Sequence, residues 1–396
     1  MAWLGNAPEL WHNPARMPDG PAATIGLLRH YFLRRSETFI YTQLRSIERY
    51  AVSVFALERI MPEAFPWTDV TALRSLPLGG AEAHLYRATT WSPRFFRWAR
   101  SVKLIHAHLG QTGVHGLYAA RRLGLPLVTS FYGHDVTLRG SRDRFYPYYW
   151  HYWLLSGKLF RRGDRFLVLS KHMRDALVAQ GCPADKIRVV PLGVDLARFD
   201  LPRPPARDDG PLRVLMVGRE VEKKGFEDGV RACALARDAG VDVRLTLLGT
   251  NDELKPRIME VARELRLDMA WPDPASPVPH AMSEADVLLV PSRTSASGDQ
   301  EGTPTVICEA GAARLPVIST RHAGIPEQIE HGTTGLLADE GDPAGLARHL
   351  VSLAADRPGA RAMGAAGRAK MASSYSIQAN RSAVEAVYDE LLQART

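Results

Sequence analysis

With 396 residues, of which 45% are hydrophobic and 23% charged, the chain is long enough for two folded domains with separate cores, and its composition excludes a disordered or fibrous protein. Its three cysteines, far apart and without a CxxC pair, exclude a disulfide framework and a cysteine-rich metal site and favour a reducing cytoplasm. The formal net charge of +7 is unevenly distributed: residues 1–205 carry 28 Lys and Arg against 15 Asp and Glu, whereas the remaining residues carry 22 against 28. Unless this difference arises by chance, we expect the first half to meet an anionic partner.

The chain begins without a recognisable targeting signal. Residues 1–6 lack the basic and apolar regions of a signal peptide, and no run approaches the ~20 apolar residues of a membrane-spanning helix. We therefore expect a cytoplasmic protein that is soluble or lies on the inner face of the cytoplasmic membrane.

Apolar runs of β type then alternate with amphipathic helical patterns, such as residues 171–180, which Gly181 and Pro183 end. Each run is typical of a parallel strand buried on both faces, so the first half predicts a βαβ array. The expected strands are residues 24–28, 52–57, 104–106, 127–131, 165–169 and 188–191.

A proline-rich polar stretch, residues 201–211, separates this array from a second one. We therefore predict an α/β protein of two Rossmann-like domains, residues 1–203 and 204–374. A last helical pattern over residues 376–393 could pack on either domain. In the second array the expected strands are residues 213–217, 243–248, 287–290 and 317–319, and the expected helices include 226–238 and 253–265.

The loop and helix after the third strand of the second array form the strongest ligand-site pattern. Open α/β sheets keep their ligands where a strand, a loop and a helix follow one another. Thr303 can cap the helix and Pro304 suits its first position, which leaves backbone N–H groups to point at an anion. Glu301 lies in the loop, and Glu309 lies at i+4 from Thr305 on the helix. The pattern predicts a site for a phosphorylated sugar.

Two cations follow the first strand of the second array. Gly218 makes the turn, and Arg219 and Lys224 precede a helix, where they can neutralise a diphosphate. A charge run by itself is as often a solvated loop. Beside the loop that carries Glu301, phosphate binding becomes the better interpretation.

Further motifs complete a pattern that resembles one known family. Four residues separate Arg219 from Lys224, and seven separate Glu301 from Glu309. The other motifs are Gly324-Ile325-Pro326-Glu327, Gly332-Thr333-Thr334-Gly335-Leu336-Leu337, Ser36-Glu37-Thr38-Phe39-Ile40, His106-Ala107-His108-Leu109-Gly110, Val168-Leu169-Ser170 and Val190-Pro191-Leu192-Gly193-Val194-Asp195. Together they resemble the retaining glycosyltransferases of family 4, which have the GT-B fold, and within it the exopolysaccharide and colanic-acid type.

The resemblance implies two Rossmann-like domains facing across a cleft, with a nucleotide-sugar donor held mostly by the second and an acceptor by the first. It also implies that the final helix, residues 375–396, returns to the N-terminal domain. By motif position, Arg219 and Lys224 hold the donor diphosphate, Glu309 the ribose hydroxyls, and Glu301 the hydroxyls of the transferred sugar. The backbone amides of Gly302, Thr303 and Thr305 complete the phosphate cradle.

The first half offers candidates for the other side of the reaction. Ser36 is expected to cap a helix that begins at Glu37 and to meet the donor phosphates, although capping alone explains it equally well. Many family members have Phe-His-Gly-x-Asp where this chain has Phe131-Tyr132-Gly133-His134-Asp135. Tyr132 thus takes the usual histidine position. We expect His134 near the anomeric centre or the acceptor hydroxyl, with Asp135 orienting it or binding acceptor, and the alternative is a loop histidine satisfied by backbone.

Two features remain open between a functional and a structural role. His106 and His108 share one face of a strand end and could contact the acceptor or be buried structural histidines, and no carboxylate follows closely enough to complete a metal site. The aromatic run at residues 145–155, flanked by Arg and Lys, could lie at an anionic membrane surface or form a core helix.

We expect transfer of a hexose from a nucleoside diphosphate sugar to a hydroxyl of a glycan acceptor, lipid-linked in our preferred version, with retention and without a metal or other cofactor. Glu301, His134, Lys224 and Arg219 are the expected catalytic residues, and the cations and helix N-termini stabilise the leaving diphosphate. One alternative is a nucleotide-sugar epimerase of the same fold. Another is a nucleic-acid-binding protein, which the acidic second half disfavours, so we expect no nucleic-acid partner.

Overall fold

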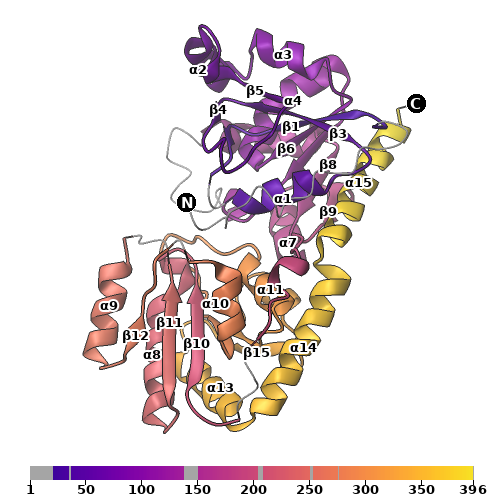
Figure 1. Ribbon diagram of the computed structural model, residues 1–396. Coiled ribbons are helices and arrows are strands. Elements are labelled where there is room, and N and C mark those ends of the chain that lie inside the picture. Colours follow the sequence, from indigo (N-terminus) through magenta and orange to yellow (C-terminus); the bar gives the residue numbers. More distant parts are fainter. Residues whose placement is uncertain are drawn as a thin grey trace. The chain divides into compact units, whose positions relative to one another are not determined.

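The structure is a computed structural model that describes residues 21–34, 37–137, 150–203, 208–249, 253–274 and 276–395. By its internal contacts the described chain separates into two units (Figure 1). Residues 194–376 form the second unit, and the described residues up to 193 together with those from 377 onwards form the first. Residues 194–203, which the sequence assigned to the N-terminal domain, therefore pack with the second unit.

A seven-stranded parallel sheet in the order β5-β3-β1-β6-β7-β8-β9 forms the centre of the first unit. The six strands expected from the sequence are all present, and β5, a three-residue strand with two half-buried residues, was not expected. Their bounds are β1 Thr24–Leu28, β3 Ala51–Ala56, β5 Val70–Ala72, β6 Leu104–His108, β7 Leu127–Ser130, β8 Arg165–Val168 and β9 Ile187–Val189. A small separate pair joins β2 (Tyr31–Phe32) to β4 (Glu58–Arg59).

Helices cover both faces of this sheet. The last helix, α15, packs Val384, Val387, Tyr388 and Leu391 against the sheet, since these residues recur at helical spacing on one side. Among the described residues, no helix combines the length and apolar character that crossing a membrane requires. The helices of the unit are α1 Thr38–Ser46, α2 Gly79–Thr89, α3 Pro93–Ala99, α4 Gly110–Leu123, α5 His134–Thr137, α6 Trp150–Arg162, α7 Lys171–Ala179 and α15 Ile377–Gln393.

The second unit has a six-stranded parallel sheet in the order β12-β11-β10-β13-β14-β15. One core cluster joins α8, α9 and α13 to the sheet, and another joins α10, α11 and α14 to it. The strands are β10 Leu212–Val217, β11 Val243–Leu248, β12 Met269–Ala270, β13 Val287–Val290, β14 Val317–Thr320 and β15 Gly335–Ala338. The helices are α8 Phe226–Asp238, α9 Lys255–Glu264, α10 Val278–Glu284, α11 Thr305–Ala312, α12 Ile325–Gln328, α13 Pro343–Ala355 and α14 Arg357–Ser374.

The strand order of the second sheet reverses between β10 and β13. From β10 the chain proceeds outward to β11 and β12, and then returns to pair β13 with the other side of β10. Ligands of open α/β sheets bind at such a switch point, beyond the carboxyl ends of the strands. The two loops that follow β10 and β13, which carry Lys224 and Glu301, start from this point.

Candidate functional site

The loops after β10 and β13 are joined by three side chains of the three-residue turn Glu222–Lys224. Lys224 Nζ lies 3.0 Å from Glu301 Oε2, and Lys223 Nζ lies 2.9 Å from Asp299 Oδ2. Glu222 Oε1 accepts a hydrogen bond of 3.0 Å from the backbone N–H of Ala296. The structure thus brings the predicted Lys224 and Glu301 into direct contact across the switch point.

The Glu301 carboxylate is held in its charged form by this contact. Its side chain is only 10% exposed, and burial by itself raises a carboxyl pKa. The ammonium groups of Lys224 and then Lys223 outweigh that effect, so that the pKa of Glu301 lies below its usual value. The site therefore contains an ionised acceptor beside two cations.

The N-terminus of α11 presents backbone donors beside Glu301. The helix begins at Thr305, Pro304 occupies the N-cap position in an extended conformation, and no side chain caps it. The prediction that Thr303 caps the helix is wrong, because the proline takes the cap position itself and leaves the threonine one residue too early. Within the described part of the chain, the backbone N–H groups of Gly302, Thr303 and Thr305 make no hydrogen bond.

Glu309 lies on the open side of the same helix. It and Thr305 are the two residues of α11 that are not buried, which agrees with their i, i+4 spacing. Burial raises the pKa of Glu309, while Arg198, in the turn Ala197–Phe199, and Lys224 act against that rise. Arg219 is exposed, and its side chain makes no hydrogen bond or ion pair with the described residues, so its guanidinium can turn toward a ligand.

Three further residues hold this site, and the sequence did not indicate them. His322 Nε2 accepts the backbone N–H of Glu301 at 3.0 Å, and His322 Nδ1 lies 2.7 Å from Glu340 Oε1. Gln328 Nε2 donates to the backbone carbonyl of Pro304 at 3.1 Å. His322 and Glu340 follow the ends of β14 and β15, and that position at the carboxyl edge is the one signal that could have indicated them.

In the first unit, Asp135 has a structural role in the turn after β7. Its carboxylate accepts the backbone N–H groups of Tyr132 (3.0 Å), Gly133 (3.1 Å) and Gly110 (3.0 Å). Burial raises the pKa of Asp135 in spite of these three bonds. They tie this turn to the start of α4. Two roles of Asp135, a contact with the acceptor and the orientation of the half-buried His134, stay predictions.

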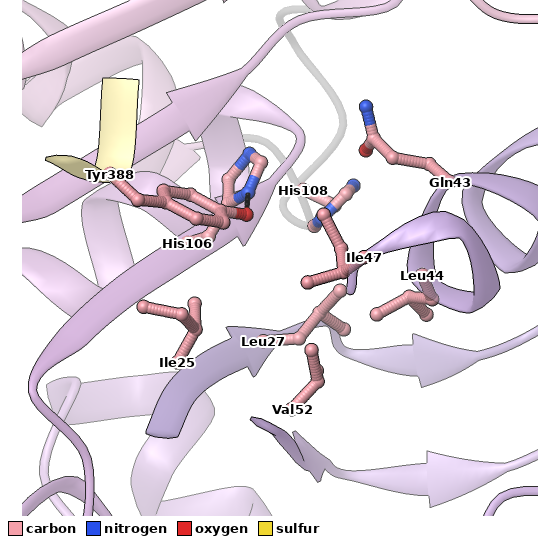
Figure 2. A pocket seen from close by; sticks show the side chains of 9 residues that line it. All are labelled: Ile25, Leu27, Gln43, Leu44, Ile47, Val52, His106, His108 and Tyr388. Atoms are coloured by element: carbon pink, nitrogen blue, oxygen red, sulfur yellow. Dashed lines mark hydrogen bonds between the residues drawn. The ribbon is translucent and has the colours of Figure 1, made fainter. Parts of the chain in front are cut away.

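His106, His108 and Tyr132 form one hydrogen-bonded and stacked group (Figure 2 shows both histidines). His106 lies within β6 and has both ring nitrogens engaged, at 2.6 Å from the Tyr388 hydroxyl and 2.7 Å from the Ser130 hydroxyl. Its ring stacks on that of His108 with centroids 4.3 Å apart, and His108 Nδ1 lies 2.6 Å from the Tyr132 hydroxyl. Burial lowers the pKa of His106 to about 3 and that of His108 well below its usual value.

Of these two histidines, His108 retains an unused nitrogen. Its Nε2 is buried and makes no hydrogen bond within the described residues. The ring borders a small cavity whose polar lining is completed by His106, Gln43 and Tyr388 (Figure 2). The rest of the lining is apolar, from Ile25, Leu27, Leu44, Ile47 and Val52. His108 is thus better placed than His106 to bind a polar group, and an acceptor contact from either stays a prediction.

Two predicted features fall wholly or partly outside the described residues. Ser36 lies outside them, and α1 begins at Thr38 with Glu37 in the N-cap position, one residue later than expected. Of the aromatic run, residues 145–149 also lie outside, whereas the rest begins α6. That helix has a buried side with Tyr152, Leu159 and Phe160 and an exposed side with Trp150, Trp153 and Leu154.

In the described residues, no group of three or more histidines, cysteines and carboxylates is arranged to hold a metal ion. Metal independence stays a prediction.

Two family models match the chain, one for each unit. Residues 37–198 match the model described as glycosyltransferase family 4, and residues 211–356 match the model described as glycosyl transferases group 1. The two matched segments contain all the predicted site residues except Ser36.

Curated relatives align with the larger part of the chain. It is 36% identical over 252 residues to the putative colanic acid biosynthesis glycosyltransferase WcaL of Escherichia coli strain K12. The alignment covers 62% of this chain and 60% of WcaL. It is 33% identical over 285 residues to the amylovoran biosynthesis glycosyltransferase AmsK of Erwinia amylovora, which covers 70% of this chain and 67% of AmsK. The chain therefore spans between 60% and 67% of the length of these relatives.

The fold matches that of solved glycosyltransferases. The crystal structure of Anabaena Alr3699/HepE in complex with UDP-glucose superposes with a TM-score of 0.73 over 93% of this chain and 100% of that one, at 18% identity. At that identity the match establishes the fold alone, which is GT-B.

Proposed function

The chain belongs to glycosyltransferase family 4, of the exopolysaccharide and colanic-acid type, and from this membership we propose that it transfers a hexose from a nucleoside diphosphate sugar to a hydroxyl of a glycan acceptor. We further propose that the anomeric configuration is retained and that the product serves the synthesis of a bacterial exopolysaccharide. The names of WcaL and AmsK support the last part, since both are described as enzymes of such pathways.

The observation that carries the proposal is the pairing of Lys224 with Glu301 beside unpaired backbone N–H groups. A sugar diphosphate offers hydroxyl donors and phosphate acceptors a few ångströms apart. Glu301 can accept from the hydroxyls, while Lys224 and the N–H groups of Gly302 and Thr303 can donate to the phosphates. When the ligand separates the ion pair, its hydroxyls replace Lys224 as donors to Glu301, and its phosphates replace Glu301 as acceptors for Lys224.

The mechanism that we propose uses electrostatic stabilisation of the leaving diphosphate. In this mechanism Lys224, Arg219 and the start of α11 stabilise the negative charge that develops as the glycosidic bond to phosphate breaks. Glu301 fixes the sugar and Glu309 the ribose. The acceptor hydroxyl then attacks from the face that the diphosphate leaves and passes its proton to the departing phosphate oxygen.

We assign the acceptor to the first unit, near the turn that carries Tyr132 and His134. Tyr132 is half-buried, and its hydroxyl is engaged by His108, whereas His134 begins the short helix α5. We propose that His134 contacts the reacting sugar or the acceptor and that Tyr132 positions His108.

A membrane surface is part of the proposal, since the acceptor that we prefer is lipid-linked. The exposed side of α6 combines Trp150, Trp153 and Leu154 with the exposed cations Lys158 and Arg161. Aromatic rings at headgroup depth next to cations are typical of binding to anionic lipid. We propose that the protein works in the cytoplasm, at the inner face of the cytoplasmic membrane.

Calorimetry with nucleoside diphosphates and their sugars tests the donor site. Glu309→Ala and Lys224→Ala should each lose affinity by about tenfold or more, because each removes a charged hydrogen-bonding partner of the ligand. Glu264→Ala, which alters an exposed helix-surface acid of the same unit, is the matched control. Unchanged affinity in both site variants, with the folded signal retained, would remove the donor-site assignment.

Two further experiments separate the alternatives. An epimer that forms from nucleotide sugar without acceptor would favour the epimerase.

Cosedimentation with phosphatidylglycerol vesicles should fall for Trp153→Ser/Leu154→Ser and not for Leu235→Ser, an exposed leucine of the second unit. Absence of vesicle binding by the wild type would rule out the membrane part of the proposal.

A further inference from the structure

The carboxyl edge of the second sheet carries a continuous row of polar contacts. Lys224 follows β10, Glu301 follows β13, His322 follows β14 and Glu340 follows β15, which is the order of these strands in the sheet. Consecutive members touch, at 3.0 Å from Lys224 Nζ to Glu301 Oε2, 3.0 Å from Glu301 N to His322 Nε2 and 2.7 Å from His322 Nδ1 to Glu340 Oε1.

The hydrogen bonds define which nitrogen of His322 carries the proton. The backbone N–H of Glu301 can only donate, so His322 Nε2 must hold a lone pair. The proton of the neutral ring then lies on Nδ1 and is donated to Glu340 Oε1. Burial raises the pKa of Glu340, but hydrogen bonds from Thr294 and His322 outweigh it and leave a carboxylate to accept that proton.

Glu340 connects this row back to the loop that carries Glu301. Its second oxygen accepts the backbone N–H of Thr294 at 2.8 Å, so His322 and Glu340 together hold the loop near its start and at Glu301. The His322 side chain is fully buried, so water cannot replace either hydrogen bond of its ring. The pair therefore fixes the backbone from which the Glu301 carboxylate projects.

We propose that His322 and Glu340 are positioning residues for the sugar-binding carboxylate of Glu301, and that they govern the affinity for the sugar part of the donor more than for its nucleotide. Neither side chain touches the ligand in this proposal. The proposal rests on the proposed function for its ligand, whereas the hydrogen-bond relay itself can be tested without one.

Two conservative substitutions separate the two bonds of the ring. His322→Gln places a terminal amide oxygen near the position of Nε2 and can still accept from Glu301 N–H. His322→Asn places an amide N–H near the position of Nδ1 and can still donate to Glu340, but it leaves Glu301 N–H without an acceptor. Glu340→Gln retains the shape of the carboxylate but offers one acceptor oxygen where two N–H donors need one each.

The binding test compares UDP with UDP-glucose and GDP with GDP-mannose by calorimetry, using whichever pair the wild type binds. His322→Asn and Glu340→Gln should weaken binding of the sugar nucleotide by about tenfold, with less than about a twofold change for the free nucleotide, because one hydrogen bond to the loop is lost. His322→Gln should stay within about threefold of the wild type for both ligands. Equal losses for nucleotide and sugar nucleotide in His322→Asn, or a full loss in His322→Gln, would overturn the proposal.

Amide hydrogen exchange of peptides from residues 292–304 provides a test that needs no ligand. His322→Asn should speed exchange in this segment, and His322→Gln should leave it close to the wild type. Unchanged exchange in His322→Asn would overturn the relay. If the wild type binds none of the four nucleotides, the proposed donor fails and with it the sugar-affinity part of the proposal, whereas the exchange result still decides whether His322 and Glu340 position the loop.

Discussion

The Lys224 to Glu301 contact couples ligand binding to local stability, because each charge is the other's main partner. With the Lys224 side chain 16% exposed and that of Glu301 10% exposed, neither can be fully rehydrated when its partner is removed. Removing one partner of a buried ion pair leaves the other charge buried and uncompensated. Mutations here therefore change stability as well as affinity.

Lys224→Met should lower the free energy of unfolding by about 2 to 3 kcal/mol at pH 7, since it leaves a buried carboxylate with only Lys223, 3.9 Å away. The pKa of Glu301 is depressed in the wild type, so its stabilising contribution is present above the unfolded pKa and is lost as the pH falls through the folded pKa. Urea unfolding at pH 7 and pH 4.5 should show a smaller difference between variant and wild type at the lower pH. Lys224→Met/Glu301→Gln should recover most of the loss, and a larger difference at pH 4.5 would contradict this account.

Buried histidines of the first unit should make it sensitive to acid. Burial lowers the pKa of His106 to about 3 and that of His115 to about 4, so both stay neutral in the native state while the unfolded chain takes up protons below about pH 6.5. The unfolded state then binds more protons, and stability should fall with decreasing pH by about 1.4 kcal/mol per pH unit for each histidine down to about pH 4.

Urea unfolding between pH 7 and pH 4 measures this slope. His115→Gln can still donate to the Gln111 carbonyl, to which His115 Nδ1 lies at 2.8 Å, and it should flatten the slope by about one histidine's share. His84→Gln, at an exposed position of α2, should leave the slope unchanged. A slope that is the same in all three proteins would show that His115 does not titrate as described.

At the scale of single residues, the sequence indicated residues that belong to a short-range pattern and missed residues whose role depends on the arrangement of the sheet. Glu301, Glu309, Arg219 and Lys224 were predicted as site residues because their spacing within a loop or helix is itself informative. His322 and Gln328 occur in a turn and a short helix without any periodic signal. Their role depends on the order of β13, β14 and β15 in space, which the sequence alone does not give.

At the scale of elements, the parallel strands were the most predictable because a strand buried on both faces is apolar throughout. The sequence indicated every strand of five or six residues, whereas it missed the four-residue β15, which begins at Gly335, and the shorter β2, β4, β5 and β12. The start of α11 was misplaced by one residue because Pro304 is acceptable both at a cap and in a first turn. Boundaries of this kind depend on backbone angles that several sequences share.

The stripe on α15 should contribute strongly to the stability of the first unit. Leu391 is 7% exposed and belongs to the cluster that joins this helix to the sheet. Leu391→Ala should lower the free energy of unfolding by about 2 to 3 kcal/mol, since it removes apolar contacts and leaves space that the sheet cannot fill. Ser382→Ala, on the exposed side of α15, should have little effect in the same urea experiment. Equal effects of the two variants would contradict the packing role of the stripe.

At the scale of the whole molecule, the uneven charge follows the division into units. The basic first part of the chain carries the candidate acceptor side and the exposed aromatic face of α6, and the acidic second part carries the proposed donor site. Three cations of the second unit, Arg219, Lys223 and Lys224, lie in one short segment at the switch point, where Glu220 and Glu222 alternate with them. Such local concentration focuses attraction for a diphosphate where the net charge would repel it.

Because each unit has its own sheet and its own core clusters, scanning calorimetry should resolve two unfolding transitions. Nucleoside diphosphate binds the second unit in our assignment, so at 100 times its Kd it should stabilise that unit by about 2.7 kcal/mol and raise the Tm of one transition by roughly 5 to 10 °C. The Tm of the other transition should move little. Leu391→Ala identifies the first unit by lowering its Tm, and Lys224→Ala should reduce the nucleotide shift of the second to about half or less at the same nucleotide concentration. An equal shift of both transitions, or a shift confined to the transition that Leu391→Ala lowers, would show that the nucleotide does not bind the second unit alone. Either result would overturn the assignment of the donor to the second unit and of the acceptor to the first.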